Sequence, residues 1–497
     1  MPQNDRSPTM PAFRRPAAAA RAVPPDAIAL AVPGTPNMPH IERPSTARGG
    51  SGWIGGSTGC RKSTLFTHFQ VQSIAYEYAH VPPSARRSWV LFDLKGDGCE
   101  PLLGGLARIP GALENTYYLD PFARNGAPGQ FPLNLMRADT AGLPTDLLAV
   151  QFAHLIGHVS GAGVLAMPLG GRQMERISST AHAAWETPGS SPIWIVDALS
   201  NPAAMDRLAA RCPNERARRF LQAVRLPPDA MAATWTRVKS VLSPYAEVEN
   251  MFGASSSLDW ARLTAPGVTT IVRMGDPPGG SLELVEFFAS LLVRQCFSYL
   301  LASRQSPWPG PATTIAIDEC QLAAVGLQDI LRRLVETGRS RNLQILLISQ
   351  GTRALRDASG ALFESLLTNS RYAITGRLAS ADAALYVREA LGPAVAQSTA
   401  SRITSELISL PPGEFYFSEA NGLPIRFRAV DADREGWARA LRANATAIEA
   451  MKRRLCPRPL PPAVHLEDAP EVAPRVRAAD DQVPATPQRR RPRSRLG

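Results

Sequence analysis

The stretch at residues 55–64 (GGSTGCRKST) constrains this chain more than any other. Its glycines and small hydroxyl residues allow successive backbone N–H groups to close around phosphate oxygens. A helix that starts near Lys62 would point the positive end of its dipole at the same anion. The order follows the phosphate-loop pattern GxxxxGK[ST]. We therefore predict a nucleotide-binding loop made of Gly56, Ser57, Thr58, Gly59, Cys60, Arg61, Lys62, Ser63 and Thr64.

Two residues of this loop have predicted roles of their own. Lys62 would reach the β- and γ-phosphates of ATP, and the Ser63 hydroxyl would bind Mg²⁺. Composition supports the role of the lysine, because only four of the 54 basic residues in the chain are lysines. A compact ammonium suits a position between phosphates better than a planar guanidinium does. A Gly/Ser turn followed by an ordinary helix is the alternative interpretation.

Arg61 departs from the loop pattern, because the position directly before the lysine is usually glycine. An arginine side chain there either points outward or narrows the loop and weakens nucleotide binding. The strand expected before the loop, residues 49–54, is rich in glycine and is a second departure. These departures weigh against ATP hydrolysis more than against nucleotide binding.

Composition bounds the class of protein. The chain has 497 residues, enough for two or three domains, and a net charge of +11, which favours an anionic partner such as nucleic acid. Six scattered cysteines without a CxxC pair indicate a reducing compartment rather than a zinc site or disulfides. The longest apolar run, residues 284–301, contains Glu286 and Arg294 and predicts a buried helix. We expect a cytoplasmic protein.

Strand and helix patterns alternate on both sides of a helical region, which predicts a parallel sheet covered on both faces. Strands are expected at 49–54, 88–93, 116–119, 267–274, 312–317, 344–349 and 371–375, and a hairpin at 414–418 and 425–429. Helices are expected after the loop and at 234–245, 282–303, 327–337 and 433–454.

These patterns divide the chain into five parts. We expect a disordered Pro/Ala-rich segment (1–47), the first part of an ATPase domain (48–142), an all-α insertion (143–259), the second part of the ATPase domain (260–454) and a disordered Arg/Pro-rich tail (455–497). The basic cluster at 489–495 would contact nucleic acid or remain solvated.

An apolar strand that ends in Asp318 and Glu319 provides the second half of a nucleotide-hydrolysis site. The aspartate would hold Mg²⁺, directly or through water, and the glutamate would activate the attacking water. Strand 88–93 runs into the polar turn at 94–97, which would lie at the same carboxyl edge of the sheet. Two carboxylates at a strand end also occur by accident, so the interpretation depends on the loop upstream.

Two further residues are candidates for sensing or stabilising the γ-phosphate. Gln350 ends the strand after Asp318, where a neutral amide suits a sensor, although it could simply bond to a neighbouring loop. Arg339, on the turn before that strand, is suited to act on a neighbouring subunit as an arginine finger. Arg341 is an equally placed rival, and a surface or helix-capping role is the alternative for both.

Six segments carry a family resemblance in their order and spacing. They are GGSTGCRKST (55–64), VLFDLKGD (90–97), FPLNLM (131–136), TTIAIDECQ (313–321), ETGRSRNLQILLISQ (336–350) and LLTNSRYAITG (366–376). Together they resemble the TraG/TraD-type coupling ATPases of conjugation and type IV secretion, relatives of the HerA/FtsK DNA-pumping motors. The resemblance covers roughly residues 50–440.

The resemblance implies an α/β fold: a RecA-like P-loop NTPase with a parallel-rich sheet, an all-α inserted domain and disordered termini. It also implies ATP with Mg²⁺, a homo-oligomeric ring of typically six subunits, sequence-independent DNA binding and partners in a secretion or conjugation apparatus. Lys62 and Ser63 match the phosphate-loop pair, Asp318 and Glu319 the catalytic carboxylates, Gln350 the sensor and Arg339 the finger.

One departure from the family concerns the membrane. The family usually carries N-terminal membrane-spanning helices, and a Pro/Ala-rich segment stands in their place here. We therefore expect either work in the cytoplasm or recruitment to the inner membrane by a membrane-anchored partner.

Three functional hypotheses follow from the sequence. The first is a DNA-translocating or nucleoprotein-delivering ATPase, which the pair Asp318 and Glu319 and the sensor Gln350 favour. The second is a degenerate, nucleotide-holding assembly platform, which Arg61 favours. The third is an accessory DNA-binding protein that acts through its Arg-rich tail.

Overall fold

A nine-stranded sheet carries the fold within the residues that the computed structural model describes, namely 27–29, 40–42, 51–133, 145–146, 149–150, 152–153, 171–223, 251, 258–391, 397–419, 424–429 and 432–469. The strand order is β11-β10-β9-β3-β8-β7-β4-β6-β5. The strands are β3 (Ser51–Gly55), β4 (Ser88–Asp93), β5 (Thr116–Leu119), β6 (Thr269–Arg273), β7 (Thr313–Asp318), β8 (Leu343–Ser349), β9 (Ser370–Thr375), β10 (Glu414–Glu419) and β11 (Ile425–Arg428).

The strands from β9 to β5 all run parallel, as the alternating sequence pattern predicts. Strand β10 pairs antiparallel with β9 and β11 pairs antiparallel with β10, and these two strands extend the sheet beyond β9. Every residue of β3, β4, β7 and β8 is buried. Central parallel strands are covered on both faces, which explains why they appear in the sequence as continuous apolar runs.

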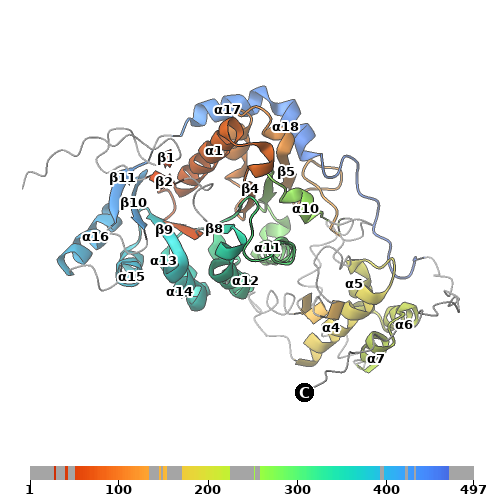
Figure 1. Cartoon of the computed structure of the whole chain (residues 1–497). Coiled ribbons are helices and arrows are strands. Elements are labelled where there is room, and N and C mark those ends of the chain that lie inside the picture. Colours follow the sequence, from red (N-terminus) through yellow and green to blue (C-terminus); the bar gives the residue numbers. More distant parts are fainter. Residues whose placement is uncertain are drawn as a thin grey trace, which may run out of the picture.

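Helices cover both faces of the sheet (Figure 1). One face packs against α1 (Lys62–His80), α2 (Cys99–Leu106) and α18 (Ala445–Lys452). The other packs against α10 (Trp260–Leu263), α11 (Leu282–Ser303), α12 (Ala324–Thr337), α14 (Gly360–Asn369), α15 (Ser380–Ala390) and α16 (Gln397–Ser409). Neighbouring residues of one strand serve opposite faces: Ile54 joins the first core and Trp53 the second. The fold is therefore a three-layer α/β sandwich.

Helix α11 contains a segment, Leu284–Ser303, that is long and apolar enough to cross a membrane by length and composition. Most of this segment (72%) is buried inside the protein. Phe287, Phe288 and Leu292 are fully buried in the core beneath the sheet. The helix therefore has the surroundings of a core helix, as the charges within its sequence predict.

Within the described residues between β5 and β6, four helices form a separate lobe (Figure 1). They are α4 (Gly171–Glu186), α5 (Pro192–Ser200), α6 (Pro202–Arg211) and α7 (Glu215–Ala223). Helix α4 packs against the other three. The boundaries of the all-α insertion and its expected helix at 234–245 lie outside the described residues. We keep the insertion as a proposal for residues 143–259.

Several elements differ from the sequence prediction. The single helix expected at 433–454 is two helices, α17 (Arg434–Ala443) and α18, because Asn444 leaves the helical conformation and its amide bonds back to the Ala440 carbonyl. Helix α2 and the helices from α13 (Thr352–Ala358) to α16 were not predicted. Within residues 1–47, β1 (Ala27–Ala29) pairs with β2 (His40–Glu42).

Residues 455–469, which we call the C-terminal strap, were expected to belong to a disordered tail. They instead contact both the sheet domain and the helical lobe. At the sheet domain, Asn125 exchanges two hydrogen bonds with the backbone of Leu460, at 3.0 and 3.2 Å. At the lobe, the Asp197 carboxylate accepts bonds from His465 (2.9 Å) and from the Leu466 N–H (2.8 Å).

The strap also buries apolar side chains, which explains why it does not behave as a solvated tail. Leu466 is fully buried, and Leu455 and Leu460 pack against the same core. The Trp194 indole donates to the Val464 carbonyl at 3.0 Å. Pro-rich composition suggested disorder, but three leucines at wide spacing are enough to attach this segment to preformed surfaces.

We predict that Leu466→Ala destabilises the protein by about 2–4 kcal/mol, because it leaves a cavity where a fully buried leucine packs. Val464→Ala is the matched control: its side chain is 49% exposed, and we expect a change within about 0.5 kcal/mol. Thermal unfolding of both variants measures the difference. Equal midpoints for the two variants would contradict the packing of the strap.

Candidate functional site

The predicted phosphate loop connects β3 to α1 at the carboxyl edge of the sheet. Its backbone is fastened to the strands on either side. The Gly56 N–H donates to the Ser349 carbonyl at the end of β8 (3.2 Å), and the Ser57 N–H donates to the Arg377 carbonyl just after β9 (2.7 Å). The loop therefore has a fixed position above the sheet, with the first N–H groups of α1 directed toward its interior.

Cys60 lies beneath the loop rather than on its surface. Its side chain is fully buried, and burial raises the pKa of the thiol. A Cβ atom on Gly56 would lie 2.6 Å from the Cys60 sulfur, so the first position of the loop motif requires glycine. Any contact of Cys60 with a nucleotide would therefore come from its backbone. Thr58 and Gly59 form the exposed tip of the loop.

Arg61 adopts the left-handed conformation (φ 72°, ψ 24°) that the usual glycine would adopt at this position. This conformation costs a non-glycine residue about 1–2 kcal/mol. The side chain extends toward Gly413, where an added Cβ would lie 3.8 Å from Arg61 Cδ and Nη1. Of the two sequence alternatives, the structure therefore shows the outward one: the backbone keeps the path of the motif and the side chain leaves the loop.

Lys62 and Glu319 meet across the site, although 256 residues separate them in the sequence. The Lys62 ammonium lies 3.5 Å from the Glu319 carboxylate, and both side chains are almost fully buried. Glu319 follows β7 in a left-handed conformation (φ 56°), which directs it away from the line of the strand. Gln321 donates a hydrogen bond to the same carboxylate. Strain of this kind is frequent at functional sites.

Asp318 lies at the end of β7 and receives a hydrogen bond from the Ser63 hydroxyl. The two residues predicted to hold Mg²⁺ are therefore in contact. Burial, followed by repulsion from the Asp93 and Glu319 carboxylates, raises the pKa of Asp318 to about 7. A divalent cation beside these carboxylates would relieve this repulsion and favour the ionised form.

Asp93 is a site residue that the sequence analysis did not select. It ends β4 directly beside Asp318 in the register of the sheet. Its carboxylate accepts hydrogen bonds from the N–H groups of Gly96 (2.7 Å) and Gly98 (2.8 Å) and shapes the turn at 94–97. The signal was present in the sequence, because SWVLFD and TTIAID are both apolar strands that end in aspartate.

Gln350 follows β8 and lies next to the loop. Its side-chain oxygen is 3.5 Å from the Thr58 hydroxyl. Because β8 lies between β3 and β7, the amide stands between the loop and the acidic strand. This position agrees with the expectation that Gln350 faces the γ-phosphate, and its sensing role stays a prediction.

The structure does not bring Arg339 to the site of its own chain. Arg339 belongs to the turn η7 (Gly338–Arg341), which precedes β8 and lies at the opposite, amino edge of the sheet. Its side chain is exposed and lines a cavity beside Trp308 and Glu336. Arg341 is half-buried, and its Nε is enclosed. Exposure therefore favours Arg339 over Arg341 for a contact with a second subunit.

The residues at the carboxyl edge fit ATP with Mg²⁺. The Ser57 hydroxyl is buried without a hydrogen-bond partner, and a phosphate oxygen would satisfy it. The buried ammonium of Lys62 supplies positive charge, and Ser63 and Asp318 supply the hard oxygen ligands that Mg²⁺ prefers. Bound Mg²⁺ would neutralise phosphate charge and polarise the terminal phosphoryl group.

Fold and site together define a P-loop NTPase of the RecA-like class. The loop follows β3, the acidic pair Asp318 and Glu319 stands at the end of β7, and β8 is inserted between these two strands. No protein-family model matches the chain, and none of the curated proteins matches it.

The comparison with solved structures gives distant matches. The conjugative coupling protein TrwB is 14% identical, with a TM-score of 0.46, over 79% of this chain and 86% of that chain. TrwB in complex with ADP and Mg²⁺ is 15% identical, with a TM-score of 0.49, over 79% and 87%. VirB4 of Thermoanaerobacter pseudethanolicus is 12% identical, with a TM-score of 0.48, over 82% and 98%. The assignment of the class rests on the geometry of this chain.

We predict that Arg61→Gly stabilises the folded chain by about 1 kcal/mol, because glycine adopts a left-handed conformation without steric cost. Arg61→Ala removes the same guanidinium and keeps a Cβ atom, so it isolates the backbone effect. Chemical denaturation of the three proteins measures their free energies of unfolding. A glycine variant that is no more stable than the alanine variant would contradict the strain at this position.

We predict that Asp318→Asn makes the nucleotide-free chain more stable above pH 7. The raised pKa means that the folded state binds this proton more tightly than the unfolded state, so native stability falls as pH rises toward 7. The advantage of the asparagine variant should grow by about 1 kcal/mol between pH 6 and pH 8. Denaturation at both pH values checks this, and an advantage that shrinks with rising pH would contradict it.

Proposed function

We propose that this chain is an ATPase that converts the hydrolysis of Mg-ATP at the carboxyl edge of its sheet into movement of a substrate. The observation that carries the proposal is the approach of Lys62, Glu319 and the Ser63–Asp318 pair. These four groups come from two distant parts of the sequence. Phosphoryl transfer needs a phosphate-binding cation, metal ligands and a water-activating base, and the site supplies each of them.

Each side chain has a proposed step. Lys62 binds the β- and γ-phosphates, and its ion pair with Glu319 is exchanged for a phosphate contact. Glu319 then accepts a proton from the attacking water. Ser63 and Asp318 would hold Mg²⁺, which would supply positive charge beside the phosphate chain. Gln350, beside the loop, donates a hydrogen bond to the γ-phosphate. Because Gln350 directly follows β8, this bond connects binding of the γ-phosphate to the end of that strand.

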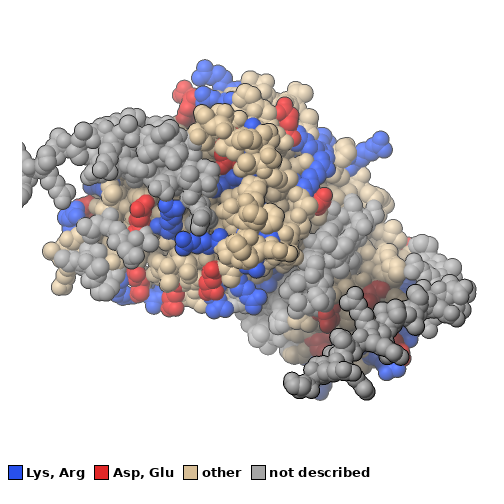
Figure 2. Space-filling view, in the orientation of Figure 1, with Lys and Arg blue, Asp and Glu red and all other residues tan. Residues whose placement is uncertain are grey.

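We assign the substrate from the family resemblance of the motifs. Their order supports a coupling ATPase of a conjugative or type IV secretion apparatus that moves DNA or delivers a nucleoprotein without reading sequence. The net charge of +11 agrees with a polyanionic partner. Figure 2 shows Lys and Arg interspersed with Asp and Glu over the visible face of the molecule. We propose that the DNA contacts a surface formed by several subunits.

A ring of subunits, six in the family, explains the position of Arg339. The nucleotide site and Arg339 lie at opposite edges of one sheet. A head-to-tail arrangement of subunits brings the two edges together at each interface. The proposed location is the cytoplasm, with a membrane-anchored partner of the apparatus as the means of recruitment to the inner membrane.

The second candidate function is a nucleotide-holding assembly platform of the same apparatus. The observation that favours it is the left-handed backbone of Arg61. The strain of this backbone makes the loop conformation less stable than it would be with glycine at the same position. The close approach of Lys62 and Glu319 favours the enzyme, because a platform has no use for a water-activating carboxylate.

The third hypothesis, DNA binding by the Arg-rich tail, has to be tested without disturbing the strap. Deletion after residue 456 would also remove the buried Leu466 and the hydrogen bonds to Asp197. Deletion after residue 469 removes the basic cluster and keeps these contacts. DNA affinity unchanged by this shorter deletion would exclude the tail as the main DNA-binding element.

We predict DNA-stimulated ATP hydrolysis by the native chain, reduced at least about 100-fold by Glu319→Gln, because a general base contributes about 10²–10⁴-fold. Lys62→Ala should abolish both turnover and ATP binding, while Glu319→Gln keeps binding. Steady-state turnover and equilibrium binding, with and without DNA, test this. ATP binding that depends on Lys62, without any turnover, would establish the platform instead.

We predict that Arg339→Ala abolishes turnover and that mixing it with Lys62→Ala restores part of it. In a mixed ring, an intact Arg339 from one subunit faces an intact Lys62 from the next. The matched control is Arg341→Ala, which should keep most of the native turnover because its side chain is half-buried. Native turnover by Arg339→Ala alone, or no recovery of turnover in the mixture, would remove Arg339 from the mechanism.

A further inference from the structure

The arginine in place of the usual loop glycine opens onto a pocket of its own. This pocket has a volume of about 110 Å³ and lies beside the start of α1. Its walls include Arg61, Thr64, Gly413, Phe415 and Arg434. Two guanidinium groups thus border one small, partly open pocket directly next to the predicted phosphate loop.

The helix places this pocket on the side of α1 away from the γ-phosphate groups. Successive helical residues rotate by about 100°, so Lys62 and Thr64 project in nearly opposite directions. Lys62 points to Glu319, whereas the Thr64 hydroxyl accepts a hydrogen bond from Arg434. Arg61, the residue directly before the helix, lines the same pocket as Thr64. A nucleotide with its γ-phosphate at Lys62 would extend toward this pocket.

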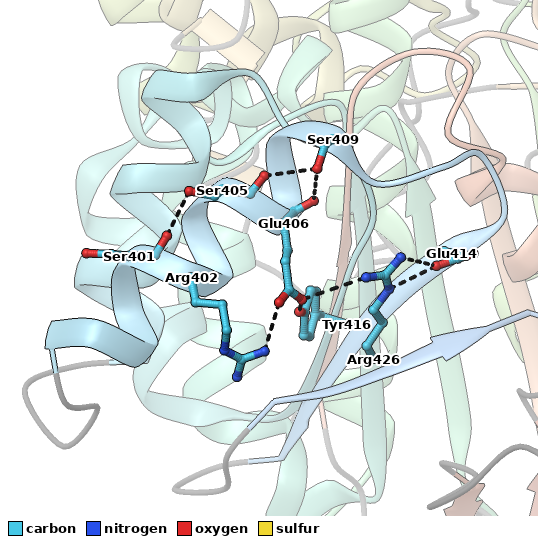
Figure 3. A network of polar contacts seen from close by, with 8 residues as sticks. All are labelled: Ser401, Arg402, Ser405, Glu406, Ser409, Glu414, Tyr416 and Arg426. Carbon is cyan, nitrogen blue, oxygen red and sulfur yellow. Dashed lines mark hydrogen bonds and ion pairs between the residues drawn. The ribbon is translucent and has the colours of Figure 1, made fainter. Parts of the chain in front are cut away.

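A network of ion pairs and hydrogen bonds involves Glu414 and Tyr416 (Figure 3), the two neighbours of Phe415, which lines the pocket. Glu414 accepts two hydrogen bonds from Arg426, at 2.7 and 2.9 Å. Tyr416 donates to Glu406 of α16, and Arg402 donates to the same carboxylate at 2.8 Å. Because side chains alternate along β10, Phe415 between them points the other way, into the core that contains Cys60.

A neighbouring pocket of about 380 Å³ is the alternative location for the nucleoside end of a nucleotide. It lies between α1, α2 and α17 and shares Thr64 and Arg434 with the first pocket. Asp97 and Glu100 belong to its lining, and their negative charges would repel a phosphate. The charge of the walls therefore favours the pocket that contains Arg61.

We propose that the pocket between Arg61 and Arg434 receives the nucleoside end of a nucleoside di- or triphosphate. The two guanidinium groups donate hydrogen bonds to the ribose hydroxyls. Arg61 then has a binding role that glycine would not supply, and its outward direction is the reason that it is compatible with the loop. The inference rests on the proposed nucleotide site and identifies which residues hold the end of the ligand away from Lys62.

Calorimetric binding of two ligands to the full chain, in the presence of Mg²⁺, tests this assignment. ADP carries the nucleoside, and inorganic tripolyphosphate does not. We expect Arg61→Ala and Arg434→Ala each to raise the Kd for ADP about tenfold, as the loss of a charge-assisted hydrogen bond would do. The Kd for tripolyphosphate should change less than about twofold. Arg439→Ala, which removes an exposed arginine of α17 outside the pocket, should change neither value.

The variant Arg61→Gly distinguishes an effect of Arg61 on ADP binding from an effect on the stability of the fold. It should raise the melting temperature and still weaken ADP binding as Arg61→Ala does. Equal losses of ADP and tripolyphosphate affinity in Arg61→Ala would overturn the inference, because Arg61 would then act on the phosphate chain. Unchanged affinity for both would overturn it as well.

The same experiment distinguishes this inference from the proposed function. If the native chain binds ADP and Lys62→Ala weakens both ligands while Arg61→Ala weakens neither, only the inference fails. If the native chain binds neither ligand, the proposed function fails and the inference fails with it.

Discussion

The parallel pairing of β3, β8 and β7 is the constraint on which the rest of the structure depends. Parallel strands end at the same edge, so the loop after Gly55 and the carboxylates after Ile317 meet there. The inserted β8 separates them by one strand, which leaves room for a phosphate group. The apolar cores on both faces hold these strands in register. A one-residue shift of β7 would turn Asp318 toward the opposite face of the sheet.

The sequence predicts much of this arrangement, because strong local patterns specify it. Strands 88–93 and 116–119 and helix 282–303 agree with the structure at both ends. The helices between 352 and 409 were missed, since small and polar residues interrupt their apolar periodicity. The break at Asn444 and the strap depend on tertiary contacts that no local pattern specifies. From the sequence alone, a Pro-rich segment with widely spaced leucines has the composition of a linker, and only the folded structure shows the surfaces on which the leucines pack.

The sequence identified most residues of the candidate site, but it gave less information on how their side chains are arranged in space. Lys62, Ser63, Asp318, Glu319 and Gln350 come together at one edge. Asp93 was overlooked because a lone aspartate at a strand end is a weak signal without the register. The direction of the Arg61 side chain depends on Gly413, which is 352 residues away in the sequence. Only the folded structure shows whether the Arg61 side chain narrows the loop or points away from it.

The strap changes how the helical lobe is attached. An inserted lobe is ordinarily connected by the two chain segments that enter and leave it, which allow it to pivot. Here a third connection runs from Asn125 of the sheet domain to Asp197 and Trp194 of the lobe. Motion of the lobe relative to the sheet domain therefore requires the strap to lose its hydrogen bonds at one end, and these contacts set the threshold for that motion.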